Sequence, residues 1–278
     1  MSFRIVLLAL GVLLLGAMLA LVLASRAFER GQREQARRLA AELPAAASPS
    51  AAALAALPEP VRRYLPYAMP EGIPAARGVL LEHGGTFRLQ PEADWLPMTG
   101  RERFFLGRPA FLWSARIRMF PGLVVAVHDH YALGEGAVDA RLLGVLPVAR
   151  ASGPEVAQSA LLRFLGEAVW APPALLPSPW LRWEALDAHR ARAHIADGAL
   201  QGSAVFTFDD QGAITGFEAQ RYRMVGDRNV LTPFYGRTRD YRRFGALRVP
   251  TFAEAGWRVD GAEQPFIRLE VVGVTLEP

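Results

Sequence analysis

The sequence His128-Asp129-His130 contains side chains of the types that bind metal ions or transfer protons. In a β-strand the two histidines lie on one face, where two imidazoles can act as zinc ligands, and Asp129 lies on the other. The remaining three of the five histidines are in distant segments, so we predict no metal site. We expect Asp129 and Tyr131, which share a strand face, to form a buried hydrogen-bonding pair.

A second candidate pair is Arg163 and Glu167, which lie four residues apart in a segment with helical periodicity. At this spacing the two side chains can form an ion pair on one helix face. On a solvated surface such a pair contributes little to stability. If the face looks into a cavity, Glu167 becomes an anchor for the polar part of a ligand. We favour the solvated interpretation and keep the cavity as the alternative.

Arginines alternate with aromatic residues from Arg221 to Arg248. Arginine with aromatics can bind single-stranded nucleic acid or anionic lipid headgroups. A third interpretation is the solvent-exposed face of a sheet, because Arg237, Arg239 and Arg243 are all odd-numbered and would lie on one face of a strand. The net charge of +4 is too small to demand nucleic acid, so we expect no nucleic-acid partner and predict these three arginines to face headgroups.

The motifs of several enzyme classes are absent from the sequence, including G-x-S-x-G, the Walker phosphate loop and H-E-x-x-H. There is no cysteine, which excludes disulfides and thiolate metal sites. We therefore expect no cofactor, and we favour a binding protein over an enzyme. A catalytic role, if there is one, would use Glu167 or Asp129.

The segment from Ile5 to Ala24 carries no charge, and as a helix it would span about 30 Å. It predicts a transmembrane anchor over residues 1–24, in a single-pass protein of the bacterial cytoplasmic membrane. The alternative is a signal peptide cleaved after Val22-Leu23-Ala24. Arginines that follow the segment favour a cytoplasmic domain, whereas one span before a large domain is typical of export, so the side stays open.

Residues 25–56 predict an Arg/Glu-rich helical stalk followed by an Ala/Pro/Ser linker, and residues 57–278 predict one globular domain. The alternation of apolar and polar residues from Phe111 to Met119 indicates a strand whose buried face carries Phe111, Trp113 and Ile117. Leu123–Leu133 and Ala137–Val148 are expected to continue it as an antiparallel meander.

A 3.6-residue period predicts one substantial helix from Pro154 to Val169. The apolar, proline-rich segment Trp170–Trp183, which includes Trp180, is a candidate lid. Strands resume afterwards, with a hairpin turn at Asp209–Gly212. The expected fold class is α+β and mostly antiparallel: a curved sheet or half-barrel with one main helix, preceded by the transmembrane helix.

The sequence resembles an uncharacterised bacterial family of unknown function whose members open with L-P-x-x-V-x-R-Y. Here the motif is Leu57 to Tyr64, LPEPVRRY. Further matches are PAFLW (109–113), DHYALGEG (129–136), RFLGE (163–167) and RVP (248–250). The resemblance implies a β-rich domain and no established activity. More distantly, the expected fold is similar to half-barrel domains that carry lipids or lipoproteins in bacterial envelopes.

Our main hypothesis is a membrane-anchored, non-catalytic domain that binds a hydrophobic or lipid-like ligand in the cavity of its curved sheet. The candidate ligand-binding residues are Trp113, Phe111, Ile117, Asp129, Tyr131, Arg163, Glu167 and Trp180. The alternative is an accessory or structural subunit of a membrane protein complex. Membrane lipid, and in the alternative other subunits of the complex, are the expected partners.

Overall fold

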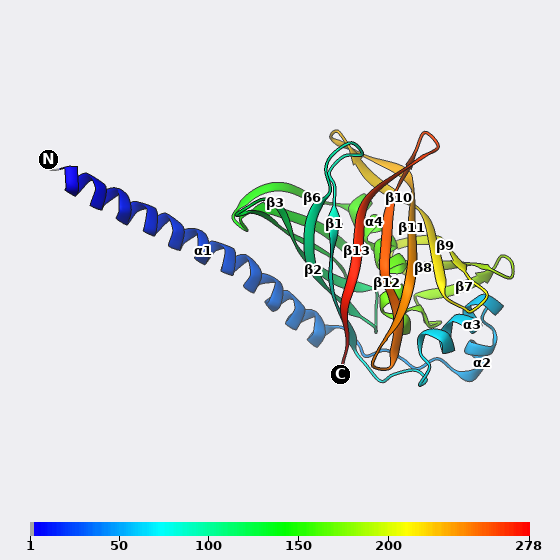
Figure 1. Ribbon diagram of the computed structural model, residues 1–278. Coiled ribbons are helices and arrows are strands. Elements are labelled where there is room, and N and C mark those ends of the chain that lie inside the picture. The colour runs from blue at the N-terminus through cyan, green and yellow to red at the C-terminus, as the bar shows by residue number, and fades with distance from the viewer. Residues whose placement is uncertain (1–2) are drawn as a thin grey trace.

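The computed structural model describes the backbone of residues 3–278 (Figure 1). The side chains of residues 3–11, 13, 14, 17 and 21 lie outside the described residues. The helices are α1 (Phe3–Glu42), α2 (Ala51–Ala55), α3 (Glu59–Ala68) and α4 (Pro154–Glu167), with the short 3-10 turns η1 (Ala168–Trp170) and η2 (Pro172–Leu175).

A single curved antiparallel sheet of 13 strands makes up most of the described chain. The strands are β1 (Gly78–Phe87), β2 (Leu96–Phe105), β3 (Ala110–Phe120), β4 (Leu123–Ala132), β5 (Glu135–Leu142), β6 (Leu146–Ser152), β7 (Leu181–Ala185), β8 (Arg190–Asp197), β9 (Leu200–Phe208), β10 (Ile214–Val225), β11 (Arg228–Phe244), β12 (Leu247–Val259) and β13 (Ala262–Glu277). Their order is β6-β5-β4-β3-β2-β1-β13-β12-β11-β10-β9-β8-β7, so the pairing of β1 with β13 joins two meanders. The predicted curved antiparallel sheet is confirmed.

One predicted strand is in fact two. Ala137–Val148 contains the turn between β5 and β6, where Leu143 and Gly144 both have positive φ. The apolar run Leu142-Leu143-Gly144-Val145 hides this turn, because its residues look like the middle of a strand rather than a loop. The Asp209–Gly212 turn is confirmed, and Gly212 has the expected left-handed φ of 96°.

The helix α4 lies inside the curve of the sheet, as Figure 1 shows. Its buried stripe includes Ala157, Leu161, Phe164 and Leu165, as the helical period predicted. It contacts strands of both meanders, from β3–β6 on one side to β8–β11 on the other. The close approach of α4 to β5 explains the glycine at position 136, because a Cβ there would lie 2.8 Å from the Cα of Ala157.

The proline-rich segment after α4 is largely core, which differs from the predicted lid. Leu175 is fully buried, and its carbonyl accepts a hydrogen bond of 3.0 Å from Nε1 of Trp183. Trp170 is also buried and donates to the carbonyl of Pro250. The segment reaches the surface only from Pro177 onward, where Pro179 is exposed and Trp180 is half-buried.

The C-terminal half of α1 packs on the convex face of β2–β4. Ala36, Leu39 and Leu43 form a buried cluster with strand residues that include Phe105 and Leu112. This differs from the predicted solvated stalk. The reason is that an apolar stripe at positions 36, 39 and 43 recurs at helical spacing within the Arg/Glu-rich segment.

The N-terminal half of α1 projects away from the sheet (Figure 1). Its described apolar side chains, which include Val12, Leu15 and Leu19, are exposed. Within the part of the chain whose side chains are described, no helix is both long and apolar enough to cross a membrane. Much of the predicted span Ile5–Ala24 lies outside that part, so the span stays a prediction.

Candidate functional site

A cluster of charged side chains lies in the interior of the curve, around Arg163 of α4. Nε of Arg163 lies 2.8 Å from Oε2 of Glu167, and its Nη1 pairs with Oδ2 of Asp129 on β4. Nη2 lies 3.8 Å from Oε1 of Glu102 on β2. The side chain of Arg163 is only 12% exposed. The solvated interpretation of the Arg163–Glu167 pair is therefore wrong, because this helix face looks into the sheet.

Two of the predicted aromatic residues form a wall of the cluster. The guanidinium of Arg163 lies 4.9 Å from the ring centre of Phe111 and 4.7 Å from that of Trp113, distances that suit cation–π contact. Nε1 of Trp113 donates to Nε2 of His83 at 2.9 Å. That acceptor nitrogen requires the proton of His83 on Nδ1, which lies 3.1 Å from the carbonyl oxygen of Gly84. Burial lowers the pKa of His83 and keeps the ring neutral.

Glu102 is the member of the cluster that the sequence interpretation missed. It is 1% exposed, and neither carboxylate oxygen has a hydrogen-bond donor among the described residues. Burial raises the pKa of Glu102 well above its ordinary value, and the nearby Glu167 carboxylate adds to the effect. A signal was present in the sequence: Glu102 has the same parity as the buried residues Met98 and Phe104 of its strand.

The predicted Asp129–Tyr131 pair is wrong in its partners. Tyr131 is fully buried and the Asp129 side chain is 14% exposed, but Asp129 pairs with Arg163, whereas the hydroxyl of Tyr131 donates to Oδ2 of Asp197 at 2.8 Å. Burial raises the pKa of Asp129, and the charge of Arg163 opposes that rise. Side chains two residues apart on one strand face are parallel neighbours, so each meets partners on other elements.

Arg221 of β10 is the second buried arginine of the interior. Its Nε donates to the carbonyl of Ser159 at 3.1 Å, and its guanidinium lies 4.3 Å from the ring centre of Phe234. Burial, together with the charge of Arg163, lowers its pKa to about 10. A cavity of about 60 Å³ adjoins Arg163, Glu167 and Arg221. It has room for a few water molecules and not for an acyl chain.

Ile117 and Trp180 lie away from the charged cluster. Ile117 is a core residue of β3. Trp180 packs edge-on against Phe164 with ring centres 5.8 Å apart, and it lines an open groove of about 1040 Å³. The structure thus brings together five of the eight predicted ligand residues, namely Phe111, Trp113, Asp129, Arg163 and Glu167.

The groove is formed by chain segments that are far apart in sequence. Its lining is mostly apolar and comprises residues 44–49, 73–77, 106–108, 173, 176–180, 196–198 and 278. Polar groups stand at its rim, where Nε of Arg108 pairs with Oδ1 of Asp197 at 2.6 Å. Nη2 of Arg77 donates to the carbonyls of Ala40 and Leu43, which caps the C-terminus of α1 and fixes the start of the linker.

A glycine holds the linker against the sheet at this groove. A Cβ on Gly107, in the turn between β2 and β3, would lie 1.8 Å from the carbonyl oxygen of Pro44. Only a residue without a side chain lets the two backbones approach so closely. One wall of the groove is therefore the linker that continues directly from α1.

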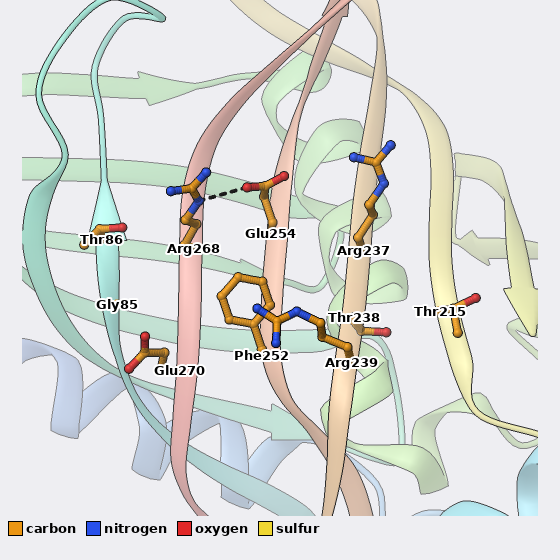
Figure 2. A pocket seen from close by; sticks show the side chains of 10 residues that line it. All are labelled: Gly85, Thr86, Thr215, Arg237, Thr238, Arg239, Phe252, Glu254, Arg268 and Glu270. Carbon is orange, nitrogen blue, oxygen red and sulfur yellow. Dashed lines mark hydrogen bonds and ion pairs between the residues drawn. The ribbon is translucent and has the colours of Figure 1, made fainter. Parts of the chain in front are cut away.

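The outer face of the sheet carries a shallow depression of about 860 Å³ across β1 and β10–β13, with α4 behind the sheet (Figure 2). Arg237 and Arg239 line it, and they pair with Glu263 and Asp240. Arg243 contacts Glu71 beyond α3, so the three predicted headgroup arginines do not form one surface. Each has an acidic partner, and their contact with headgroups stays a prediction.

The two histidines of the His128-Asp129-His130 sequence are not part of the interior. The ring of His128 stacks on Phe28 of α1, with centres 3.8 Å apart, on the convex face. Among the described residues no group of three or more His, Cys, Asp or Glu side chains is placed to hold a metal ion.

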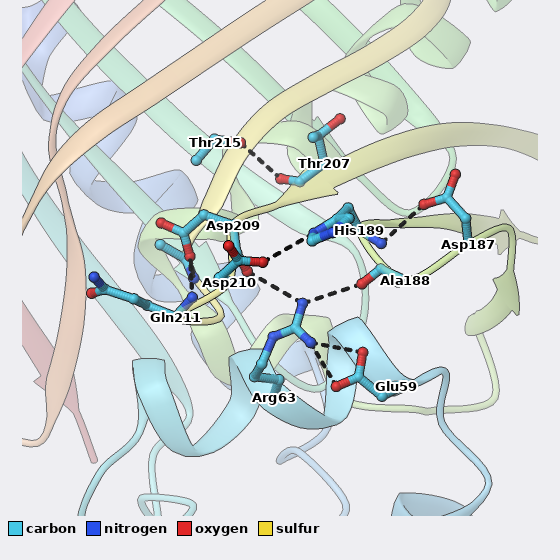
Figure 3. A network of polar contacts seen from close by, with 11 residues as sticks. Glu59, Arg63, Asp187, Ala188, His189, Thr207, Asp209, Asp210, Gln211 and Thr215 are labelled. Atoms are coloured by element: carbon cyan, nitrogen blue, oxygen red, sulfur yellow. Dashed lines mark hydrogen bonds and ion pairs between the residues drawn. The ribbon is translucent and has the colours of Figure 1, made fainter.

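The L-P-x-x-V-x-R-Y sequence forms the start of α3 and has a structural role. Val61 and Tyr64 are fully buried. Figure 3 shows Arg63 between Glu59, at 2.6 Å, and the carbonyls of Ala188 and Asp209, both at 3.2 Å. This arginine therefore ties α3 to two turns of the sheet.

Comparisons with known proteins agree with the resemblance seen in the sequence. The model of a family described as "Family of unknown function (DUF6544)" matches residues 47–269. No curated protein matches the chain.

Three solved structures resemble this fold at low sequence identity. A LolA superfamily protein from Nitrosomonas europaea has 9% identity and a TM-score of 0.43, covering 79% of this chain and 92% of its own. A DUF1329 family protein from Desulfovibrio piger has 11% identity and a TM-score of 0.41, with coverages of 79% and 93%. A putative outer membrane lipoprotein-sorting protein domain from Vibrio parahaemolyticus has 10% identity and a TM-score of 0.38, with coverages of 72% and 85%. At this level of similarity no ligand or residue role transfers to the chain.

Proposed function

The chain belongs to the DUF6544 family of unknown function, and from its own structure we propose that it is a membrane-held domain that binds a lipid-like ligand. The observation that carries the proposal is the open groove of about 1040 Å³, which is mostly apolar and has charged groups at its rim. Pockets that bind drug-sized molecules are typically about 300–1,000 Å³, with apolar walls and few polar groups.

The ligand lies in this groove rather than in the interior of the curve. The interior is filled by α4 and by core residues such as Phe111 and Trp113, and its cavity is only about 60 Å³. In the groove the apolar part of the ligand contacts Ile73, Leu106 and Trp180. Its polar end lies near Arg108, whose side chain is partly exposed beside Asp197.

The N-terminal half of α1 holds the domain at a bacterial membrane. Its described apolar side chains are exposed and no part of the domain covers them, which would be unfavourable for a helix in water. The chain runs from this helix through the linker, residues 44–49, directly into the wall of the groove. The C-terminal half of α1, which packs on the sheet, separates the membrane-held half from this linker, so the groove lies about 30 Å along the helix from residue 24.

The proposal includes no catalysis. Glu167 and Asp129 are both engaged by Arg163, and the cavity beside them holds only a few water molecules. Their role in the proposal is to hold α4 inside the sheet.

Native mass spectrometry of the full-length chain in mild detergent tests the proposal. We expect bound lipid on the wild-type protein and at least about tenfold weaker retention in Ile73→Glu, because the change puts a charge into an apolar groove. Ile73 is exposed, so the melting temperature should not change. Leu89→Glu is the matched control, since Leu89 is exposed on the β1–β2 hairpin outside the groove.

Equal lipid retention in Ile73→Glu and Leu89→Glu would contradict a ligand site in the groove. Stable co-purifying proteins with no lipid would instead favour the accessory-subunit alternative.

A further inference from the structure

Two hairpin turns lie beside α1 at the end of its apolar half. The β3–β4 turn contains Gly122, and the β5–β6 turn contains Gly144. Both glycines line one small depression, of about 180 Å³, together with Val22 and Ser25 of α1. A Cβ on Gly144 would lie 2.7 Å from Oγ of Ser25. The helix therefore passes both hairpin tips at residues 22–25. Figure 1 shows α1 running past the ends of the strands near β3 and β6.

The same tips expose large apolar side chains. Phe120 is 67% exposed and stands two residues before Gly122. Leu146 is 61% exposed and stands two residues after Gly144. At the same level of α1, Leu19 and Leu23 are exposed as well. Apolar side chains of the sheet and of the helix thus meet water side by side, which is unusual for a surface without a partner.

Contacts along the next turns of α1 fix the direction in which the helix leaves the sheet. Phe28 stacks on His128, Glu29 pairs with Arg116 at 3.2 Å, and Gln32 accepts a hydrogen bond from Ser114. Ala36 and Leu39 are buried one and two turns further on. Because the helix is held over this length, the hairpin tips lie at a defined height along it.

Exposed arginines surround this level of the structure. Arg26 and Arg30 follow on α1, and Arg118 stands two residues before Phe120. None of the three forms an ion pair with a described residue. Arginines next to apolar side chains, with an aromatic ring among them, match the chemistry of an anionic bilayer surface.

We propose that the tips of the β3–β4 and β5–β6 hairpins form a lipid-contacting surface that seats the domain directly on an anionic bilayer. Phe120 and Leu146 lie among the headgroups, Arg26 and Arg118 contact the phosphates, and the helix enters the bilayer beside them. The inference rests on the part of the proposed function that holds α1 in a membrane. It adds that the domain has one orientation there and is not a freely swinging body.

A protein partner suits this surface less well than lipid. The outermost strand β6 carries Pro147 between Leu146 and Val148. Proline has no N–H to offer to an added strand, and it is a common protection of sheet edges against such pairing. The surface consists of two narrow hairpin tips beside a helix, which is a shape that can enter a headgroup layer.

The absence of cysteine from the chain allows a direct test with single-cysteine variants. Full-length Phe120→Cys, Leu146→Cys, Leu15→Cys and Leu89→Cys are each labelled with an environment-sensitive fluorophore and reconstituted into vesicles of phosphatidylcholine and phosphatidylglycerol. All four side chains are exposed, so labelling should leave the core intact, and circular dichroism checks this. Quenchers are a spin label at the lipid headgroup, a spin label deep in the acyl chain, and iodide in water.

We expect the label at position 15 to be quenched by the deep spin label, and the labels at 120 and 146 by the headgroup spin label. The label at 89, on a hairpin elsewhere on the sheet, should respond to iodide alone. If position 15 is quenched from the lipid while 120 and 146 respond only to iodide, the proposed contact of the hairpin tips with the bilayer is wrong, whereas the attachment of α1 to the membrane still holds.

Other results overturn the inference in different ways. If position 15 also responds only to iodide, α1 does not enter the bilayer, and the proposed contact of the hairpin tips is wrong as well. Binding of lipid in the groove is then decided by its own test. Equal headgroup quenching at 120 and 89 would mean that the domain has no preferred orientation. If a co-purifying protein shields position 120 from both quenchers, the surface is a protein interface.

Discussion

The interior and the outer face of the sheet use the same chemistry in different surroundings. Inside, Arg163 pairs with Asp129 and Glu167. Outside, both Nη atoms of Arg237 lie 2.7 Å from the two carboxylate oxygens of Glu263, a better bidentate geometry than any inside. The side chain of Arg237 is 54% exposed, against 12% for Arg163.

The difference shows that burial rather than geometry decides whether the pKa of a carboxylate in an ion pair falls or rises. The outer arginine lowers the pKa of Glu263, as expected for a carboxylate that keeps its water and gains a cation. In the interior, desolvation is stronger than the attraction, and the pKa values of Glu102 and Asp129 rise although Arg163 is in contact. A buried cation that serves several acids at once is therefore much harder to replace than an exposed one.

The largest effect should come from removing the central cation. Arg163→Met keeps much of the volume and leaves Asp129 and Glu167 buried without their partner. Breaking a buried pair by deleting one partner costs about 3–5 kcal/mol, so we expect the free energy of unfolding to fall by about that amount. Urea unfolding of the full-length chain in mild detergent measures it.

A double variant separates the charge from the packing in this test. Arg163→Met with Asp129→Asn removes one stranded carboxylate, and it should recover part of the loss. If Arg163→Met alone unfolds at the same urea concentration as the wild type, the interior cluster is solvated and the comparison made above does not hold.

The sequence was sufficient for the sheet and the helix because both have regular periods. The alternation of apolar and polar residues from Phe111 to Met119 and the apolar stripe on Pro154–Val169 both reflect burial of one face. Burial of one face places apolar residues at regular positions within a single segment, where the pattern can be recognised. The β5–β6 turn was missed because it is formed by Leu143 and Gly144 within an apolar run. Its conformation depends on contacts with α1 and β4, which no local pattern records.

The site was predictable only in part, for a related reason. The alternation of side chains along a strand placed Asp129 and Tyr131 on one face, and helical spacing joined Arg163 with Glu167. Which side of α4 faces the sheet depends on how the two meanders close around it, so helical spacing alone does not distinguish a solvated Arg163–Glu167 pair from a buried one. Glu102 and Arg221 enter the cluster from β2 and β10, and the groove is assembled from seven separate segments. Neither is visible in any single stretch of sequence.

A second prediction sharpens the comparison through pH. The pKa of Glu102 is raised in the folded state, so the folded protein holds this proton more tightly than the unfolded chain. The corresponding stability is fully present below the unfolded pKa of about 4.3, and it is lost as the pH rises through the raised folded pKa. The loss amounts to about 1.4 kcal/mol for each unit by which the pKa is raised.

Glu102→Gln removes this dependence while it keeps the size of the side chain. We therefore expect the variant to gain stability relative to the wild type as the pH rises from about 4.3 upward. Unfolding free energies of both proteins, measured at matched pH values between acid and neutral, give the difference directly. A constant difference across this range would contradict the raised pKa of Glu102.

The smallest effect should come from the outer face. Arg237→Gln removes a bidentate pair with Glu263, but both partners keep access to water, so the unfolding free energy should fall by less than about 1 kcal/mol. Salt screens exposed pairs and reaches buried ones far less, and 1 M NaCl should therefore remove most of the difference from the wild type while it leaves the loss in Arg163→Met almost unchanged. Arg268→Gln, which breaks the outer pair with Glu254, is the matched second variant and should behave alike. Urea unfolding at low and high salt compares all of these proteins. A loss in Arg237→Gln as large as that in Arg163→Met, and equally resistant to salt, would show that geometry counts for as much as burial in this sheet.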